Sequence, residues 1–106
     1  MSEKEVNKII KKYVTLLRDS GISIERVFLY GSYARGEATY DSDIDIMLIS
    51  NSINSGNPDF KARIWELTRK VDTRIEPYIV SSRRFISDDV SPLLQIVKKE
   101  GKEILA

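Results

Sequence analysis

Two aspartates separated by one residue lie inside an apolar run of this sequence. Asp43 and Asp45 are the acidic members of the segment DIDIMLI. In a β-strand, residues two positions apart project from the same face, with Cα atoms roughly 7 Å apart. Two carboxylates held this close either share a proton or bind a cation. Because Mg²⁺ prefers oxygen ligands and leaves positions for water and phosphate, the pair predicts an incomplete magnesium site.

A third carboxylate would let the site hold two magnesium ions, the arrangement that activates an attacking hydroxyl and stabilises a departing phosphate. Glu76, midway along the apolar segment RIEPYIV, is our candidate for this role. Asp72 is the alternative, and it ranks second because it is expected in the loop after a helix. The expected catalytic and metal-binding residues are therefore Asp43, Asp45 and Glu76.

A phosphate site is expected just upstream of the aspartates. Gly31 ends a predicted strand and lets the backbone turn sharply toward a ligand, and the next residues form a short helix or a tight turn. Amides at the start of such a helix would point at an anion, and the Ser32 hydroxyl adds a donor. Arg35 has two interpretations of equal weight: it donates to the same phosphates, or it pairs with Glu37 to hold the turn.

Residue types and spacing exclude several other chemistries. The chain has no Cys and no His, which removes thiol nucleophiles, imidazole bases and the usual zinc sites. Gly31 and Gly36 have the spacing of a Walker loop, but Glu37 and Ala38 stand where Lys and Ser or Thr are required. A P-loop is therefore excluded.

The composition restricts the class of protein and its surroundings. A chain of 106 residues suits one domain, 1–106. Its 17 basic and 16 acidic residues give a net charge of +1, which argues against holding long nucleic acid through bulk electrostatics. No apolar run approaches the roughly 18 residues of a membrane span or a signal core. We therefore expect a cytoplasmic protein without membrane attachment.

The hydrophobic pattern predicts an α/β (α+β) fold of helices and strands in one small sheet. Ser2 with Glu5 fits a capping box, and Asn57 with Pro58 fits a helix start. Pro77 cannot donate a ladder hydrogen bond and indicates an edge strand or a bulge. The expected helices cover 2–20, 57–70 and 91–100, and the expected strands cover 24–30, 42–50 and 74–80.

The second expected strand alternates with a period of two. One face carries Ile44, Ile46 and Leu48, and the other carries Asp43, Asp45, Met47 and Ile49. We interpret three large aromatic residues outside this strand as core rather than as base-stacking platforms. These residues are Phe60, Trp65 and Tyr78.

The segment GSYARGEATYDSDIDIML resembles a known signature. Gly31-Ser32, ten intervening residues and Asp43-Ile44-Asp45 are similar to the G-S-x(10)-D-x-D pattern of the DNA polymerase β nucleotidyltransferase superfamily, in the form of its minimal nucleotidyltransferase branch. The resemblance implies a small mixed sheet flanked by helices, with Gly31 and Ser32 at the β and γ phosphates of a nucleotide. The third carboxylate of the family maps onto Glu76, although the family often has Asp there.

The resemblance also implies a reaction, cofactors and a partner. The reaction is transfer of a nucleoside monophosphate from an NTP to a hydroxyl with release of pyrophosphate, and the cofactors are two Mg²⁺ ions held by the three carboxylates. Minimal members often accompany a small helical toxin of the HEPN class and act as antitoxin by attaching AMP to a tyrosine. We therefore expect ATP as donor, a HEPN-type protein as acceptor and a homo- or hetero-oligomeric assembly.

Two other hypotheses remain open. A non-catalytic binding module of the same fold could neutralise a toxin by contact alone. The Gly31-Ser32 pair and both aspartates favour the enzyme, since pure binding gives no reason to keep paired charges on a strand. Modification of a small molecule such as an aminoglycoside is the third hypothesis, and the expected absence of an acceptor-binding domain counts against it.

Overall fold

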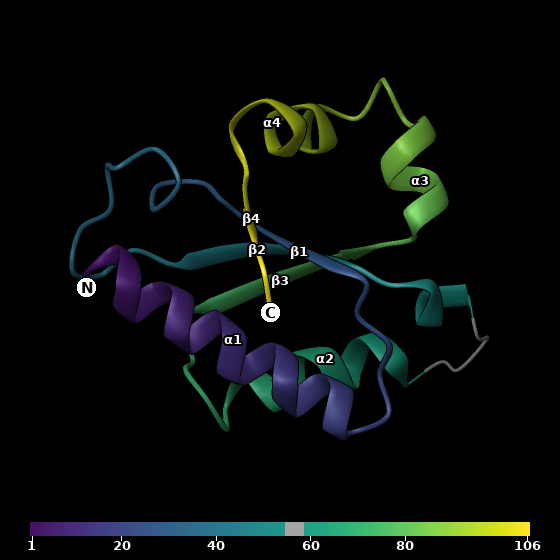
Figure 1. The fold of residues 1–106 in the computed structure, drawn as a ribbon, viewed down its shortest axis with the longest axis horizontal. Coiled ribbons are helices and arrows are strands. Elements are labelled where there is room, and N and C mark those ends of the chain that lie inside the picture. The colour runs from purple at the N-terminus through teal and green to yellow at the C-terminus, as the bar shows by residue number, and fades with distance from the viewer. Residues whose placement is uncertain (55–58) are drawn as a thin grey trace.

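The computed structural model describes residues 1–54 and 59–106 and contains one sheet with helices on both faces (Figure 1). Among these residues, no helix is both long enough and apolar enough to cross a membrane. The elements follow the chain in the order α1 (Glu3–Asp19), β1 (Arg26–Tyr30), β2 (Ile44–Ile49), the 3-10 helix η1 (Asn51–Asn54), α2 (Phe60–Thr68), β3 (Ile75–Val80), α3 (Ser82–Ser87), α4 (Pro92–Glu100) and β4 (Lys102–Ile104).

The sheet has the strand order β3-β2-β1-β4. Strand β1 pairs antiparallel with β2 and with β4, whereas β2 and β3 run parallel. A parallel pair needs a long crossover, and α2 lies in the connection between β2 and β3. The expected small mixed sheet flanked by helices is therefore confirmed.

Alternation along β2 divides the core into two clusters. The even-numbered residues from Ile44 to Leu48 pack with buried residues of α1 and α2. The odd-numbered Met47 and Ile49 pack with buried residues of α3 and α4 on the other face of the sheet, as the layers in Figure 1 show. The predicted alternation is confirmed, and it places Asp45 on the face that α4 covers.

A buried hydrogen bond joins α1 to α2. Helix α1 is capped by Ser2, whose side chain accepts from the Glu5 N–H at 3.2 Å and so forms one half of the predicted capping box. On its buried face, the Tyr13 hydroxyl donates to the Ile64 carbonyl at 2.6 Å. Burial raises the pKa of Tyr13, so the hydroxyl keeps the proton that it donates.

We expect Tyr13→Phe to lower the free energy of unfolding by about 1 kcal/mol, because a satisfied buried hydrogen bond is lost. Tyr33 provides a matched control, since its hydroxyl is buried without a partner among the described residues. Tyr33→Phe should leave the free energy of unfolding unchanged or raise it slightly. Urea denaturation of both variants and the parent measures this difference. Equal losses in the two variants would contradict the stabilising role of the Tyr13 bond.

Strand β3 lies at an edge of the sheet, as Pro77 predicts. The Ile44 N–H donates to the Arg74 carbonyl at 2.8 Å, and the Ser50 N–H donates to the Val80 carbonyl at 2.9 Å. Alternate residues of a strand bond to the same neighbour in a parallel ladder, so the even-numbered residues of β3 bond to β2. Pro77 is odd-numbered, and its nitrogen, which has no hydrogen, therefore faces the outer edge.

Besides the short 3-10 helix η1, two elements were not expected from the sequence, α3 and β4. Helix α3 begins where the Ser81 side chain accepts from the Arg84 N–H at 3.1 Å. Strand β4 follows Gly101 directly and pairs with β1. Both elements are too short for hydrophobic periodicity to reveal them.

The bounds of the expected elements also shift. Strands β1 and β2 begin at Arg26 and Ile44, each two residues later than expected, so Asp43 lies just before its strand rather than inside it. Helix α2 ends at Thr68, two residues earlier than expected. The expected helix start at Asn57 and Pro58 lies outside the described residues.

Candidate active site

A pocket of about 530 Å³ opens where the end of β1 meets the start of β2, with α4 on its other side. It brings together five residues that the sequence assigns to chemistry: Gly31, Ser32, Arg35, Asp43 and Asp45. The other residues that line it are Tyr30, Thr39, Asp41, Ser42, Leu93 and Ile96. The expected phosphate loop and the expected carboxylate pair thus share one pocket.

Asp43 and Asp45 reach this pocket from different surroundings. Asp43 is exposed, whereas Asp45 is half-buried within β2. Burial raises the pKa of Asp45, the charges of Asp43 and then Glu76 raise it further, and Arg35 acts in the opposite direction. A bound cation would stabilise this accumulated negative charge. Because the two carboxylates offer hard oxygen ligands and an open side toward the pocket, the donor set fits Mg²⁺.

Gly31 lies directly against the Asp45 carboxylate. Its φ is +74°, in the left-handed region that glycine adopts without strain. A Cβ atom at Gly31 would collide with Asp45 Oδ2. Only glycine therefore allows the backbone at the head of the phosphate loop to approach the central carboxylate this closely.

The segment after Gly31 is a series of turns, so the tight-turn alternative is right and the helix alternative is wrong. The Arg35 N–H donates to the Gly31 carbonyl at 3.1 Å, and the Glu37 N–H donates to the Ser32 carbonyl at 2.9 Å. These bonds close the loop beside the Ser32 side chain. An anion here would meet turn amides and the Ser32 hydroxyl, without a helix terminus behind them.

Arg35 forms the ion pair that one of its two interpretations predicts, and its role at a phosphate stays a prediction. Its guanidinium donates to the Glu37 carboxylate at 3.2 Å, as the turn-holding interpretation predicts, and it comes within 4.0 Å of the Glu100 carboxylate at the end of α4. The same side chain lines the pocket. Exposed ion pairs contribute little to stability. A phosphate could therefore replace Glu37 or Glu100 as the partner of Arg35 at low cost in free energy.

Glu76 lies beside Asp45 in the register of the parallel β2–β3 pair. It is not among the pocket-lining residues, and residues 1–54 and 59–106 contain no group of three or more acidic, His or Cys side chains arranged to hold a metal ion. Asp72 accepts from the Arg74 guanidinium at 2.7 and 3.0 Å, and these bonds lower the pKa of Asp72. The structure thus places Glu76 next to Asp45, and its role as third ligand stays a prediction.

Six lining residues had no role predicted from the sequence, and three of them, Tyr30, Leu93 and Ile96, lie outside the turn segment. Tyr30 is the register partner of Asp45 in β1. Burial and then the Asp45 charge raise the pKa of Tyr30 to about 12, so its hydroxyl is neutral at physiological pH. Leu93 and Ile96 lie three positions apart on α4, the spacing of one helix face. That spacing was the available signal.

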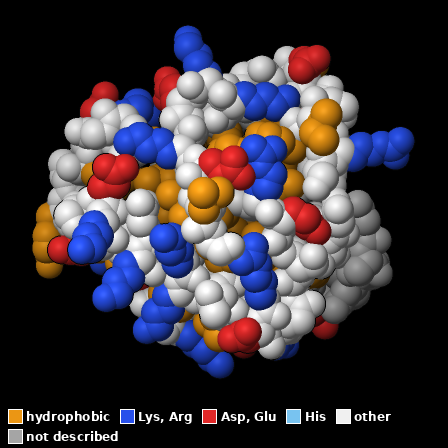
Figure 2. Space-filling view, viewed as in Figure 1, with side chains coloured by type: hydrophobic (Ala, Val, Ile, Leu, Met, Phe, Trp, Pro, Cys, Tyr) orange, Lys and Arg blue, Asp and Glu red, His pale blue; other side chains and the backbone are white. Residues whose placement is uncertain are grey.

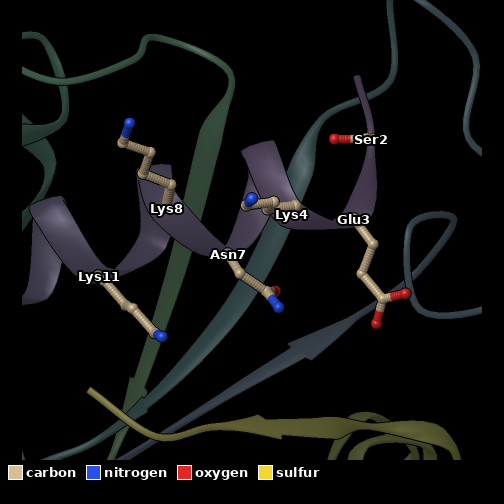
Figure 3. A pocket seen from close by; sticks show the side chains of 6 residues that line it. All are labelled: Ser2, Glu3, Lys4, Asn7, Lys8 and Lys11. Carbon is tan, nitrogen blue, oxygen red and sulfur yellow. The ribbon is translucent and has the colours of Figure 1, made fainter.

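A larger hollow of about 760 Å³ lies along the first turns of α1 (Figure 3). Its lining residues all come from the start of the chain: Ser2, Glu3, Lys4, Asn7, Lys8 and Lys11. In Figure 3 the side chains diverge, with Lys8 pointing away from Asn7 and Lys11. The space-filling view shows basic side chains spread along this helix (Figure 2). We interpret the hollow as the surface of a solvated helix rather than as a catalytic site.

A small mixed sheet with a glycine-serine turn and an aspartate pair at one end of it defines a class of nucleotide-transferring domains. The sequence matches the family described as Nucleotidyltransferase domain over residues 4–104. The match takes in most of the chain, and the chain therefore belongs to the nucleotidyltransferase domain family, as the resemblance predicted.

Individual relatives agree with this membership. Protein adenylyltransferase MntA of Shewanella oneidensis is 36% identical over 76 residues, which are 72% of this chain and 48% of that protein. A crystal structure of a putative nucleotidyltransferase from Sulfolobus solfataricus superposes with a TM-score of 0.63 at 20% identity, over 93% of this chain and 78% of that one. A chain in the crystal structure of a toxin-antitoxin with AMP-PNP superposes with a TM-score of 0.61 at 24% identity, over 94% and 73% of the two chains.

These likenesses differ in what they show. At 20% and 24% identity the two crystal structures show a shared fold. This chain spans about half the length of most of the curated relatives that it matches. The family match and the superpositions together establish the family and the fold of this chain.

Proposed function

We propose that the protein is a magnesium-dependent nucleotidyltransferase that moves AMP from ATP to a tyrosine hydroxyl of a HEPN-type toxin and thereby acts as an antitoxin in the cytoplasm. The observation that carries the proposal is the contact of Gly31 with Asp45, which joins the phosphate loop to the carboxylate pair in one pocket. The similarity to a protein adenylyltransferase supports AMP as the transferred group. The fold shared with a toxin-antitoxin chain supports a toxin as the partner.

Each residue has a role in the proposed site. Gly31 and Ser32 bind the β and γ phosphates, and Arg35 leaves Glu37 or Glu100 to donate to the same phosphates. Asp43 and Asp45 would hold Mg²⁺, and Glu76 would complete the set for a second ion. When bound, magnesium would neutralise the triphosphate and lower the pKa of the attacking hydroxyl.

The chemical change is a single displacement at the α-phosphorus. A bond forms between the tyrosine oxygen and the α-phosphorus, the bond from that phosphorus to the bridging oxygen breaks, and pyrophosphate leaves. Glu76, the register partner of Asp45 on β3, would receive the hydroxyl proton.

Transfer of label from ATP tests the proposal. The purified chain is incubated with Mg²⁺, ATP labelled at the α-phosphate and the protein encoded by the neighbouring gene. Label should appear on a tyrosine of that partner, and the variants Asp43→Asn and Asp45→Asn should not transfer it. If both variants still protect cells from the toxin as well as the parent does, the protein acts by contact and the catalytic proposal is wrong.

A paired substitution tests the choice of third carboxylate. Glu76→Gln should lower the transfer rate about 10²-fold or more, because it removes a charge beside Asp45. Asp72→Asn should leave the rate unchanged and weaken the loop before β3 by about 1 kcal/mol at most, since the Arg74 pair is partly exposed. Because the pKa of Asp72 is lowered in the fold, that small stabilisation is present at neutral pH and is lost as the pH falls through the pKa. The reverse pattern of rates would make Asp72 the third carboxylate.

A further inference from the structure

Helix α4 has more apolar surface than its packing on the sheet requires. Leu94 and Val97 are fully buried in the core cluster beneath the helix. Leu93 packs partly against this cluster and also lines the candidate active site, which Ile96 lines as well. Ile96 is 42% exposed and belongs to neither of the two core clusters. The core therefore gives no reason for an isoleucine at this position.

The pocket consists of two chemically different parts. One part is polar, and it contains the Gly31-Ser32 turn and the carboxylates of Asp43 and Asp45. The other part is bounded on the α4 side by Leu93 and Ile96. A total volume of about 530 Å³ lies within the range of small-molecule sites, so the pocket extends beyond a phosphate subsite.

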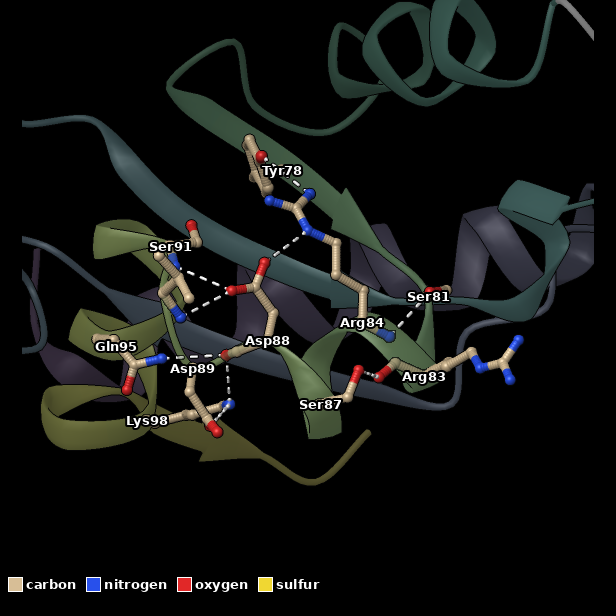
Figure 4. Close-up of polar contacts among 11 residues, drawn as sticks. Tyr78, Ser81, Arg83, Arg84, Ser87, Asp88, Asp89, Ser91, Gln95 and Lys98 are labelled. Atoms are coloured by element: carbon tan, nitrogen blue, oxygen red, sulfur yellow. Dashed lines mark hydrogen bonds and ion pairs between the residues drawn. The ribbon is translucent and has the colours of Figure 1, made fainter.

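Hydrogen bonds fix both sides of the apolar part. On the loop side, the Thr39 N–H donates to Ser42 Oγ at 2.8 Å and the Ser42 N–H donates to the Thr39 carbonyl at 3.1 Å. On the helix side, Asp88 holds the start of α4 (Figure 4): its Oδ1 accepts from the Ser91 N–H at 2.9 Å, and its carbonyl accepts from Gln95 and Lys98. These bonds order the turn on one side of the pocket and the start of α4 on the other.

We propose that the Leu93–Ile96 face of α4 is the subsite for the nucleobase of the nucleotide. This inference rests on the proposed function, because it takes the triphosphate to lie at Gly31 and Ser32. The base belongs to the same molecule as the phosphates, and its flat face is the largest apolar surface that a nucleotide offers. Apolar side chains contact that face without reading the hydrogen-bonding edge of the base. ATP and GTP should therefore bind within about ten-fold of each other.

Comparison of two ligands tests the subsite. Calorimetry in the presence of Mg²⁺ measures the binding of a non-hydrolysable ATP analogue and of inorganic tripolyphosphate to the full chain. Ile96→Ala should lower the affinity for the ATP analogue about five-fold, because part of an apolar contact is lost. The affinity for tripolyphosphate should not change. Ile96→Leu should restore the affinity for the analogue. Ile86→Ala, at a 75% exposed position on α3, serves as the control and should change neither affinity.

Three results would overturn the subsite, and they are distinguishable. If Ile96→Ala lowers the affinities for both ligands equally, Ile96 stabilises the phosphate site or the fold and does not contact the base. If it leaves both affinities unchanged while transfer to the protein acceptor falls, the face receives the acceptor and not the base. If the parent protein binds neither ligand in the presence of Mg²⁺, the proposed function fails and the subsite fails with it.

Discussion

Replacement of Asp45 with Asn should abolish nucleotidyl transfer and, in the absence of magnesium, make the protein more stable to heat. The loss of transfer, of at least about 10²–10³-fold, follows because the carboxylate at the centre of the pocket would hold the cation and face the reacting phosphate. The gain in stability follows because burial and two neighbouring negative charges raise the pKa of Asp45. A neutral amide of the same shape removes the repulsion.

The pH dependence gives this prediction a definite sign. A carboxyl group with a raised pKa in the fold contributes stability below its ordinary pKa, and that contribution is lost as the pH rises through the raised value. The parent should therefore lose stability over that range in EDTA, whereas Asp45→Asn should not. The two proteins should be equally stable at low pH, where Asp45 is neutral.

Thermal melts across pH, with EDTA and with Mg²⁺, measure these effects. Magnesium should raise the melting temperature of the parent at neutral pH and have little effect on Asp45→Asn. Asp89→Asn is the matched control, since its side chain is 88% exposed and lies outside the pocket lining. If the parent and Asp45→Asn have the same melting temperature at every pH in EDTA, the charge cluster is not a source of instability.

A second large effect is expected at Gly31. Gly31→Ala should destabilise the protein and inactivate it, because the new Cβ atom must displace the Asp45 carboxylate. The left-handed backbone costs about 1–2 kcal/mol for an L-residue, and the collision adds about 1–3 kcal/mol more. Displacement of the carboxylate would also disturb the site for the cation and the triphosphate.

Gly36 separates the two contributions. Its φ of +72° matches that of Gly31, but apart from its chain neighbours no atom of the described residues lies within 4 Å of the position where its Cβ atom would stand. Gly36→Ala should therefore lose only the backbone contribution of about 1–2 kcal/mol and keep most of its activity. Urea denaturation and the transfer assay on both variants measure the difference. Equal loss of activity in both would show that loop conformation, rather than contact with Asp45, governs the site.

Much of the site could be predicted because its signals are local. The alternation of β2 is visible in the sequence, and it correctly places Asp45 on the face of Met47 and Ile49. The glycine that ends β1 is likewise a local signal, and its positive φ agrees with the predicted sharp turn. Such features depend on neighbouring residues in the chain, which a single sequence displays.

Features that depend on contacts between distant segments were missed. The spacing of Leu93 and Ile96 indicates one face of a helix, but it does not tell which end of the sheet that face covers. Strand β4 forms because β1 offers an open edge to three residues that have no pattern of their own. The interpretation of Trp65 and Tyr78 as core residues was wrong, since they are 47% and 37% exposed. Residue type alone does not decide which side of a helix or an edge strand is covered.

The position of Pro77 has a consequence for self-association. Along the outer margin of β3, the Ile75 amide is already engaged by the Asp72 carbonyl at 3.2 Å and Pro77 has no amide hydrogen, which leaves Ile79 as the one outward donor of the strand. A foreign strand that approached this margin would gain few main-chain bonds. We therefore expect this edge to resist growth of the sheet into fibrils, although the strand itself is apolar enough to favour it.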